Sequence, residues 1–148
     1  MEGGEAGVMA VTKVFAIRVR LDDRVRYITD GEKTSLTSSI TYISNPEKTE
    51  QFFFTSVLNC SSVDTALSEM METKQQFGKT GGVLGYHFIQ SFQPGEVTPE
   101  QAHEVGVKLA ERMWGDRFQV IVATHLNTDC LHNHFVVNSV SFADGMHY

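Results

Sequence analysis

The sequence predicts an α+β domain in which an antiparallel sheet of about five strands has helices packed against one face or both. Strand-like and helix-like segments are interleaved along the chain, and successive strand-like segments lie close enough in sequence to pair antiparallel. A length of 148 residues, with 41% hydrophobic and 20% charged residues, suits one globular core and excludes a disordered chain.

Eight segments carry the periodicity of regular structure. The strand-like segments are 12–20, 50–60, 83–92, 117–125 and 132–142. The helical segments are 21–28, 63–77 and 99–114. The last helix has the clearest start, because Thr98 and Gln101 can form a capping box and Pro99 occupies the first helical position. Its expected buried stripe is Ala102, Val105, Leu109 and Met113.

The ends, the charge and the cysteines limit the class of protein. Residues 1–8 lack a periodic pattern and are expected to form a disordered leader before a domain at 9–148. The net charge of −6 argues against a nucleic-acid partner, yet six of the twelve Lys and Arg residues lie between positions 13 and 33, which permits a locally basic site. Two cysteines, no signal pattern and no long apolar run predict a soluble cytoplasmic protein without membrane insertion.

Three of the six histidines fall within ten residues, in the stretch ATHLNTDCLHNHFVVNSV at 123–140. Side chains alternate across a strand, so His132 and His134 share one face. A hairpin of the last two strand-like segments would place His125 opposite His132. Three neutral imidazoles that converge in this way can hold a divalent metal ion with open positions, where the ion polarises a phosphoryl or carbonyl oxygen. The alternative is that these are structural histidines of a loop and a core.

The tyrosines are the other candidates for chemistry, because a phenol that attacks a phosphodiester forms a covalent phosphotyrosyl link and conserves the energy of the bond. The chain has four of them. Two begin a small internal duplication, in which YITDGEKT at 27–34 recurs as YISNPEKT at 42–49.

Four segments together resemble the N-terminal nuclease domain of the relaxases, the mobilisation nucleases of conjugative plasmids and transposons, which belong to the HUH endonucleases. They are VTKVFAIRVRLDDRVRYI, YISNPEKTEQFFF, GYHFIQSFQPGE and THLNTDCLHNHFVVNSVSFADGMHY. The resemblance spans Met9 to Tyr148 and implies an antiparallel sheet flanked by helices, with a metal on the central strands. It also implies that a tyrosine nicks one DNA strand at an origin of transfer, stays attached to the 5′ phosphate and later rejoins the ends.

The resemblance also implies residue roles. The metal ligands of the family fall on His125, His132 and His134, and Asp129 matches an acidic residue of the loop between them. Relatives commonly have aspartate where this chain has Asn127. An amide can orient His125 but hardly raises its basicity, which predicts weaker metal binding or activity. The implied ion is Mg²⁺ or Mn²⁺, and three histidines also accept Zn²⁺.

Both Tyr27 and Tyr42 match the nucleophile of the family, and the same Glu-Lys-Thr follows each of them. We favour Tyr27, because its helix is better defined and because Arg24 and Arg26 lie close enough in sequence to hold a phosphate. Asp129 completes the set of candidate catalytic residues.

Three further residues are weaker candidates. Lys79 and Thr80 belong to the loop GKTGG, which would contact backbone phosphates or form an ordinary turn. His87 is expected either to border the site or to be structural.

The implied partner is single-stranded DNA at an origin of transfer, in the bacterial cytoplasm. The chain stops shortly after the histidine-rich strand, so a C-terminal truncation is expected, and the missing region would contact accessory relaxosome proteins and a coupling protein. Two alternatives remain. The first is another HUH nuclease, such as a rolling-circle replication initiator or a transposase. The second is a degenerate domain that binds an origin without nicking it.

Overall fold

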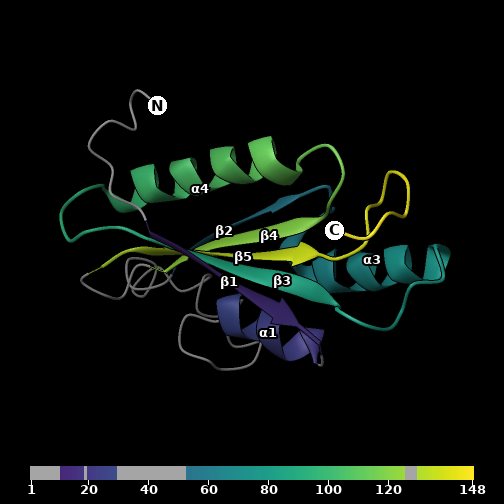
Figure 1. The fold of residues 1–148 in the computed structure, drawn as a ribbon. Coiled ribbons are helices and arrows are strands. Elements are labelled where there is room, and N and C mark those ends of the chain that lie inside the picture. Colours follow the sequence, from purple (N-terminus) through teal and green to yellow (C-terminus); the bar gives the residue numbers. More distant parts are fainter. Residues whose placement is uncertain (1–10, 19, 30–52, 126–129) are drawn as a thin grey trace.

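The computed structural model describes residues 11–18, 20–29, 53–125 and 130–148. The expected leader and the second copy of the duplicated segment lie outside these residues, so both stay predictions. Within the described part, five strands and three helices form (Figure 1). The strands are β1 (Val11–Ile17), β2 (Phe53–Leu58), β3 (Gly85–Ser91), β4 (Val120–His125) and β5 (His132–Asn138). The helices are α1 (Leu21–Thr29), α3 (Val63–Gln76) and α4 (Pro99–Trp114).

The five strands form one sheet in the order β1-β3-β5-β4-β2, and every neighbouring pair is antiparallel. This confirms the predicted fold class. The strand β5 is central, and it pairs with β4 in the expected hairpin, in which His125 lies opposite His132. On its other side β5 pairs with β3, so that His134 lies opposite Ile89.

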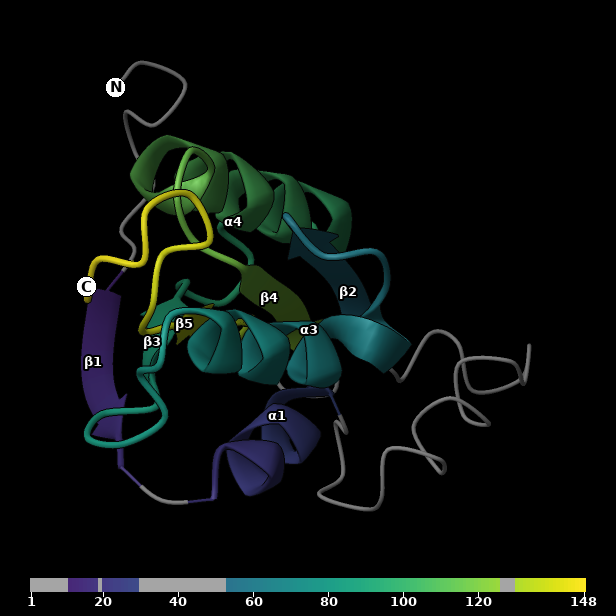
Figure 2. The same cartoon turned by 90° about the vertical axis from the view of Figure 1, so that its right-hand side faces the viewer.

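Helices cover both faces of the sheet (Figures 1 and 2). The helix α4 packs on one face, over β4 and β5, whereas α1 and α3 pack on the other. Alternate residues of β5 therefore enter two different cores: Val136 contacts the α1 and α3 side, and Phe135 and Val137 contact the α4 side. A central strand that is buried on both faces explains the apolar run FVV in this strand.

The buried stripe of α4 differs from the prediction, although the predicted capping box is present. Ala102 is buried as expected, but Met113 is 51% exposed, and the buried positions are Ala102, Gly106, Ala110 and Trp114. The small residues explain the shift. A Cβ atom on Gly106 would lie 2.6 Å from Nδ2 of Asn133, so only glycine allows the helix to approach the sheet this closely.

Candidate functional site

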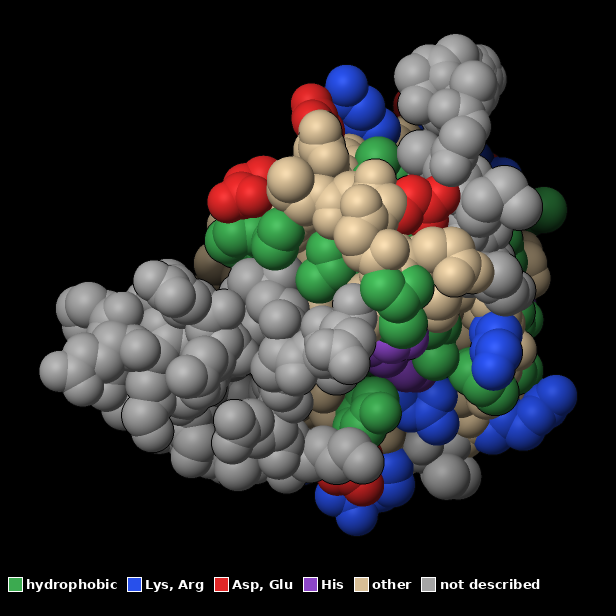
Figure 3. Space-filling model, turned by 90° about the vertical axis from the view of Figure 1, so that its left-hand side faces the viewer, with side chains coloured by type: hydrophobic (Ala, Val, Ile, Leu, Met, Phe, Trp, Pro, Cys, Tyr) green, Lys and Arg blue, Asp and Glu red, His purple; other side chains and the backbone are tan. Residues whose placement is uncertain are grey.

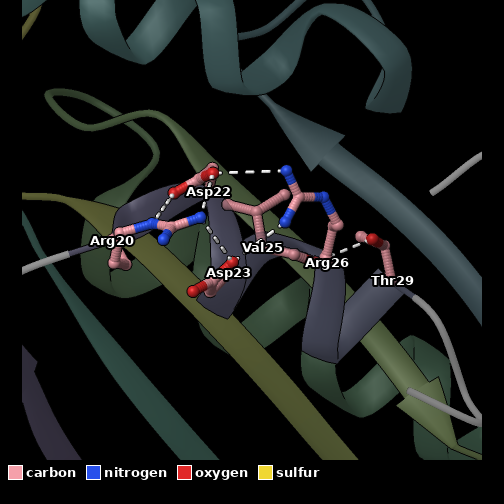
Figure 4. A network of polar contacts seen from close by, with 6 residues as sticks. All are labelled: Arg20, Asp22, Asp23, Val25, Arg26 and Thr29. Carbon is pink, nitrogen blue, oxygen red and sulfur yellow. Dashed lines mark hydrogen bonds and ion pairs between the residues drawn. The ribbon is translucent and has the colours of Figure 1, made fainter. Parts of the chain in front are cut away.

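The helix α1 packs against the sheet, and candidate site residues lie along one edge of its buried face. Leu21, Val25 and Ile28 form its buried face, and acidic residues occupy its first turn. Arg24 and Tyr27 are three residues apart and therefore share one side of the helix, next to the buried face. The first turn is tied by ion pairs of Arg20 and Arg26 with Asp22 and Asp23 (Figure 4).

Four histidines from three strands gather beneath this edge of α1, and we call His87, His125, His132 and His134 the histidine cluster. The ring of His134 lies at its centre. Its centroid is 4.2 Å from that of His125, 5.2 Å from that of His87 and 6.3 Å from that of His132. Figure 3 shows histidine side chains on this side of the molecule, between hydrophobic and basic side chains. The three histidines singled out from the sequence therefore do lie together, and β3 adds a fourth.

The two inner histidines are buried and neutral. His87 is 3% exposed and His134 is 6% exposed. Burial lowers the pKa of His87 to about 4, with further lowering by Arg24 and His125. Burial also lowers the pKa of His134, and the neighbouring histidines add to this effect. Neutral imidazole is the form that binds metal ions.

A chain of hydrogen bonds links α1 to the centre of the cluster. A guanidinium nitrogen of Arg24 lies 3.0 Å from Nδ1 of His87, and Nε2 of His87 lies 2.9 Å from Nδ1 of His134. We call these two bonds the Arg24–His87–His134 relay. In addition, Nε2 of His125 donates to the carbonyl oxygen of Ile28 at 2.9 Å. That carbonyl belongs to the last turn of α1, where helical carbonyls have no partner within the helix.

Of the two candidate nucleophiles, Tyr27 lies next to the cluster. Its ring meets those of His134 and His87 nearly edge-on, with centroids 6.0 and 6.2 Å apart. The side chain is 37% exposed, so the phenol combines contact with the cluster and access to solvent. Tyr42, Asn127 and Asp129 lie outside the described residues.

The candidate phosphate ligands are spread over two ends of the molecule. Arg26 is bound to Asp22 and Asp23, which leaves Arg24 as the cation of α1 that contacts the cluster. Lys79 and Thr80 are exposed in the loop that leads into β3, and Nζ of Lys79 donates to the carbonyl oxygen of Gly145 at 2.5 Å. This loop precedes the end of β3 that pairs with the C-terminal end of β5, whereas His132 begins β5. The structure therefore does not bring these two residues to the cluster.

His87 is the member of the histidine cluster that the sequence indicated least clearly. Its part in the relay depends on the pairing of β3 with β5, in which Ile89 opposes His134 and His87 is the next residue on the same face. Periodicity within one strand cannot give this register. The signal available in the sequence was that His87 and Ser91 alternate on one face of this strand.

The donor set of the cluster suits a divalent ion, although the rings are held by protein partners. Imidazole nitrogen is an ordinary ligand of Zn²⁺ and Mn²⁺, and the inner rings are neutral. Within the ranges that the structure describes, no group of three or more His, Cys, Asp or Glu side chains is already arranged to hold a metal. In this arrangement Nε2 of His125 and Nδ1 of His134 both have protein partners.

A second polar network lies directly behind the cluster, on the α4 face of the same strands. His103 of α4 bonds Oγ1 of Thr124 at 2.8 Å, and Thr124 donates to Oδ1 of Asn133 at 2.5 Å. The Nδ2 group of Asn133 donates to Gln90 and to the carbonyl oxygen of Ala102. Thr124 precedes His125, and Asn133 lies between His132 and His134. The network therefore ties the strands that carry the cluster to α4.

Comparison with known proteins gives consistent matches. The chain is 47% identical over 90 residues to protein rlx of Staphylococcus aureus, an alignment that covers 61% of this chain and 27% of that protein. Another rlx protein of the same organism is 40% identical over 118 residues, or 80% of this chain and 35% of its own length. The group II intron-interrupted relaxase LtrB of Lactococcus lactis is 30% identical over 155 aligned positions, which cover 82% of this chain and 28% of LtrB.

The chain thus spans roughly a third, or less, of the length of these relatives. The family model of the MobA/VirD2-like relaxase nuclease domain matches residues 42–148. This part contains β2 to β5, and therefore all three strands that carry the cluster. With this match and the two rlx proteins, the chain belongs to the relaxases and represents their MobA/VirD2-like nuclease domain.

Proposed function

We propose that this domain nicks one strand of DNA at an origin of transfer and later rejoins it, through a covalent 5′-phosphotyrosyl intermediate. One observation carries the proposal: in a chain of the relaxase family, the partly exposed Tyr27 lies against two buried, neutral histidines, His87 and His134. The relatives named relaxases support the reaction class, and the geometry of α1 and β5 supports the residue roles.

The proposed nucleophile is Tyr27, with Tyr42 as the alternative. The phenolic oxygen of the tyrosine attacks the scissile phosphorus, a new P–O bond forms, and the 3′ oxygen of the preceding nucleotide leaves and takes up a proton. One phosphodiester replaces another, so the reverse attack by a 3′ hydroxyl restores the DNA strand and the free tyrosine. Arg24 is close enough to the cluster to bind a phosphate oxygen beside the reacting group.

Nucleases of this family generally use a divalent metal ion. We propose His125, His132 and His134 as its ligands, with Mg²⁺ or Mn²⁺ as the ion and Zn²⁺ as an ion that the same nitrogens accept. Such an ion supplies Lewis-acid stabilisation of the charge that develops on the phosphoryl oxygens. Asp129 and Asn127 are proposed to support this centre, and Asn127 predicts weaker metal binding than an aspartate would give.

The proposed partner is single-stranded DNA in the bacterial cytoplasm, together with accessory relaxosome proteins and a coupling protein that contact other parts of a longer relaxase. None of the described helices is long and apolar enough to cross a membrane. Another HUH nuclease would use the same chemistry on a different DNA site.

The second candidate function is that of a domain that binds an origin of transfer without nicking it. The features that favour it are the amide at position 127 and the net charge of −6, since strong phosphate binding usually requires a basic surface. Retained DNA and metal binding without a covalent adduct would identify this case.

The test is adduct formation with single-stranded DNA taken from the region beside the gene, in Mn²⁺ or Mg²⁺, on a denaturing protein gel. We expect a metal-dependent, heat-stable shift that is lost in His134→Ala and in Tyr27→Phe and retained in Tyr42→Phe. Tyr86→Phe is the matched control, because Tyr86 packs in the core on the α4 face. A folded protein that binds the DNA but forms no adduct in either metal would favour the non-nicking alternative.

A further inference from the structure

The relay fixes where the protons of two histidines lie. A guanidinium group has only donors, so Nδ1 of His87 must accept from Arg24 and carries no hydrogen. The hydrogen of His87 is then on Nε2, which donates to Nδ1 of His134. His134 in turn carries its own hydrogen on Nε2. One contact from α1 thus sets the tautomer of the ring at the centre of the cluster.

This arrangement leaves His134 without a nitrogen for a metal ion. Its Nε2 atom carries the hydrogen, and the lone pair of its Nδ1 atom accepts from His87. A metal on Nδ1 would displace His87. A metal on Nε2 would move the hydrogen to Nδ1, which reverses the bond to His87 and places the hydrogen of His87 on Nδ1. That hydrogen would then face the N–H group of Arg24 at a donor–donor distance of 3.0 Å, which is repulsive.

We propose that Arg24 holds His134 in a tautomer that resists metal binding, and that transfer of Arg24 from His87 to a phosphate of single-stranded DNA releases it. This inference rests on the proposed function and adds a regulatory step to the same site. Phosphate binds a guanidinium group through two parallel N–H groups. Only one nitrogen of Arg24 bonds His87, and a phosphate that takes up this nitrogen would displace the ring. DNA and metal therefore bind cooperatively, and each raises the affinity of the other by the same factor.

Arg24 is placed to make this exchange. It lies on the side of α1 that carries Tyr27, whose ring contacts both histidines of the relay. Its contact with His87 is part-buried, whereas Arg26 of the same helix is bound to Asp22 and Asp23. A phosphate at the hydroxyl of Tyr27 and a phosphate at Arg24 would thus belong to the same stretch of DNA backbone.

The first experiment reads the tautomers directly. Long-range ¹H–¹⁵N correlation spectra of the imidazole rings distinguish a hydrogen on Nδ1 from one on Nε2. In the metal-free and DNA-free wild-type protein we expect both His87 and His134 to carry the hydrogen on Nε2. A His134 ring with its hydrogen on Nδ1 in that state would overturn the proposal, whatever the fate of the proposed nuclease activity.

The second experiment measures Mn²⁺ affinity without DNA, from the free-ion EPR signal. We expect Arg24→Leu to raise the affinity about tenfold, the size typical of changes next to a metal ligand. Removal of a nearby positive charge would also raise the Mn²⁺ affinity, because it removes electrostatic repulsion, so two controls are needed. Arg26→Leu removes a cation from the same helix and should leave the affinity within about twofold. In a His87→Leu background the relay is absent, and Arg24→Leu should then have no further effect, within about twofold.

The third measurement repeats the Mn²⁺ titration with a single-stranded oligothymidine present. The oligonucleotide also binds Mn²⁺, and the same titration with His134→Ala measures this contribution so that it can be subtracted. We expect the oligonucleotide to tighten Mn²⁺ binding to the wild type and to leave Arg24→Leu unchanged. If Arg24→Leu still raises the Mn²⁺ affinity in the His87→Leu background, the relay is overturned, and removal of a positive charge explains the change in affinity. If no variant takes up Mn²⁺ in a way that depends on His134, the proposed metal centre fails and the coupling fails with it.

Discussion

The two faces of the central hairpin carry polar networks of different character. On the α4 face, Thr124 and Asn133 are fully buried, and each has hydrogen-bond partners that match its donors and acceptors. On the α1 face, His125 and His134 also have partners, but these partners occupy nitrogens that the proposed chemistry requires. The first network satisfies its donors and acceptors as it stands, whereas the second would have to rearrange for the proposed chemistry. Adjacent residues of the same strands would therefore serve stability on one face and the proposed function on the other.

The largest contrast should appear when His134 is removed. We expect His134→Ala to lower the rate of adduct formation at least 100-fold, because changes beside a metal ligand already cost 10- to 100-fold and a ligand contributes more. Its free energy of unfolding should change less than that of the α4-face variant described next. The measurements are adduct yield over time and urea unfolding. An activity loss below about tenfold would remove His134 from the proposed metal centre.

The opposite pattern is expected for Asn133→Ala. This change removes bonds to Gln90 and to the carbonyl oxygen of Ala102 and leaves buried groups without partners. We expect a loss of about 2–4 kcal/mol in the free energy of unfolding, measured by urea denaturation. The exposed Gln76 of α3 provides the control, since Gln76→Ala should change stability by less than about 0.5 kcal/mol. A variant as stable as the wild type would show that the α4-face network adds no stability.

The histidine side of this contrast could be predicted from the sequence, because it depends on local periodicity. Two-residue alternation placed His132 and His134 on one face, and the hairpin placed His125 opposite His132, as the structure confirms. What could not be predicted depends on contacts between distant segments. The relay requires the register of β3 against β5 and the position of α1, neither of which any short window of sequence contains.

The error on α4 has the same origin. The residues expected to face the sheet were Ala102, Val105, Leu109 and Met113. The sheet presents the amide of Asn133 opposite Gly106, so the helix turns this glycine toward it. The buried positions after Ala102 therefore each shift by one residue. Periodicity gives the existence of an apolar face, but the shape of the opposing surface decides which residues form it.

A smaller loss of stability is expected when the space above Asn133 is filled. In Gly106→Ala the new Cβ atom would lie 2.6 Å from Nδ2 of Asn133, so that either the helix or the amide must move. Overpacking of this kind costs about 1–3 kcal/mol, which urea unfolding can measure. The matched control is Gly81→Ala in the loop before β3, where an added Cβ meets no atom within 4 Å. Equal stability of the two variants would show that the helix is not held against Asn133.

The last prediction concerns a third polar group, at the other end of the face that carries the cluster. Nζ of Lys74 in α3 donates to Oδ1 of Asn138 at 2.6 Å, to Oγ of Ser139 at 2.9 Å and to the carbonyl oxygen of Leu84, all of which are neutral. Burial lowers the pKa of Lys74 to about 8. An unfolded chain retains the ordinary value of 10.5, so between pH 8 and 10.5 the unfolded state binds more protons and stability rises with pH.

We expect this rise in the free energy of unfolding to be absent from Lys74→Met, whereas Lys108→Met, at an exposed position of α4, should retain it. Urea unfolding at pH 7.5, 9 and 10 provides the measurement. Below pH 8 both states are protonated at this site, and the contribution of Lys74 to the slope should vanish. A rise that survives in Lys74→Met would come from other groups. A rise as large as that of the wild type would mean that the neutral acceptors around Nζ compensate for the burial of the charge, so that Lys74 keeps its ordinary pKa.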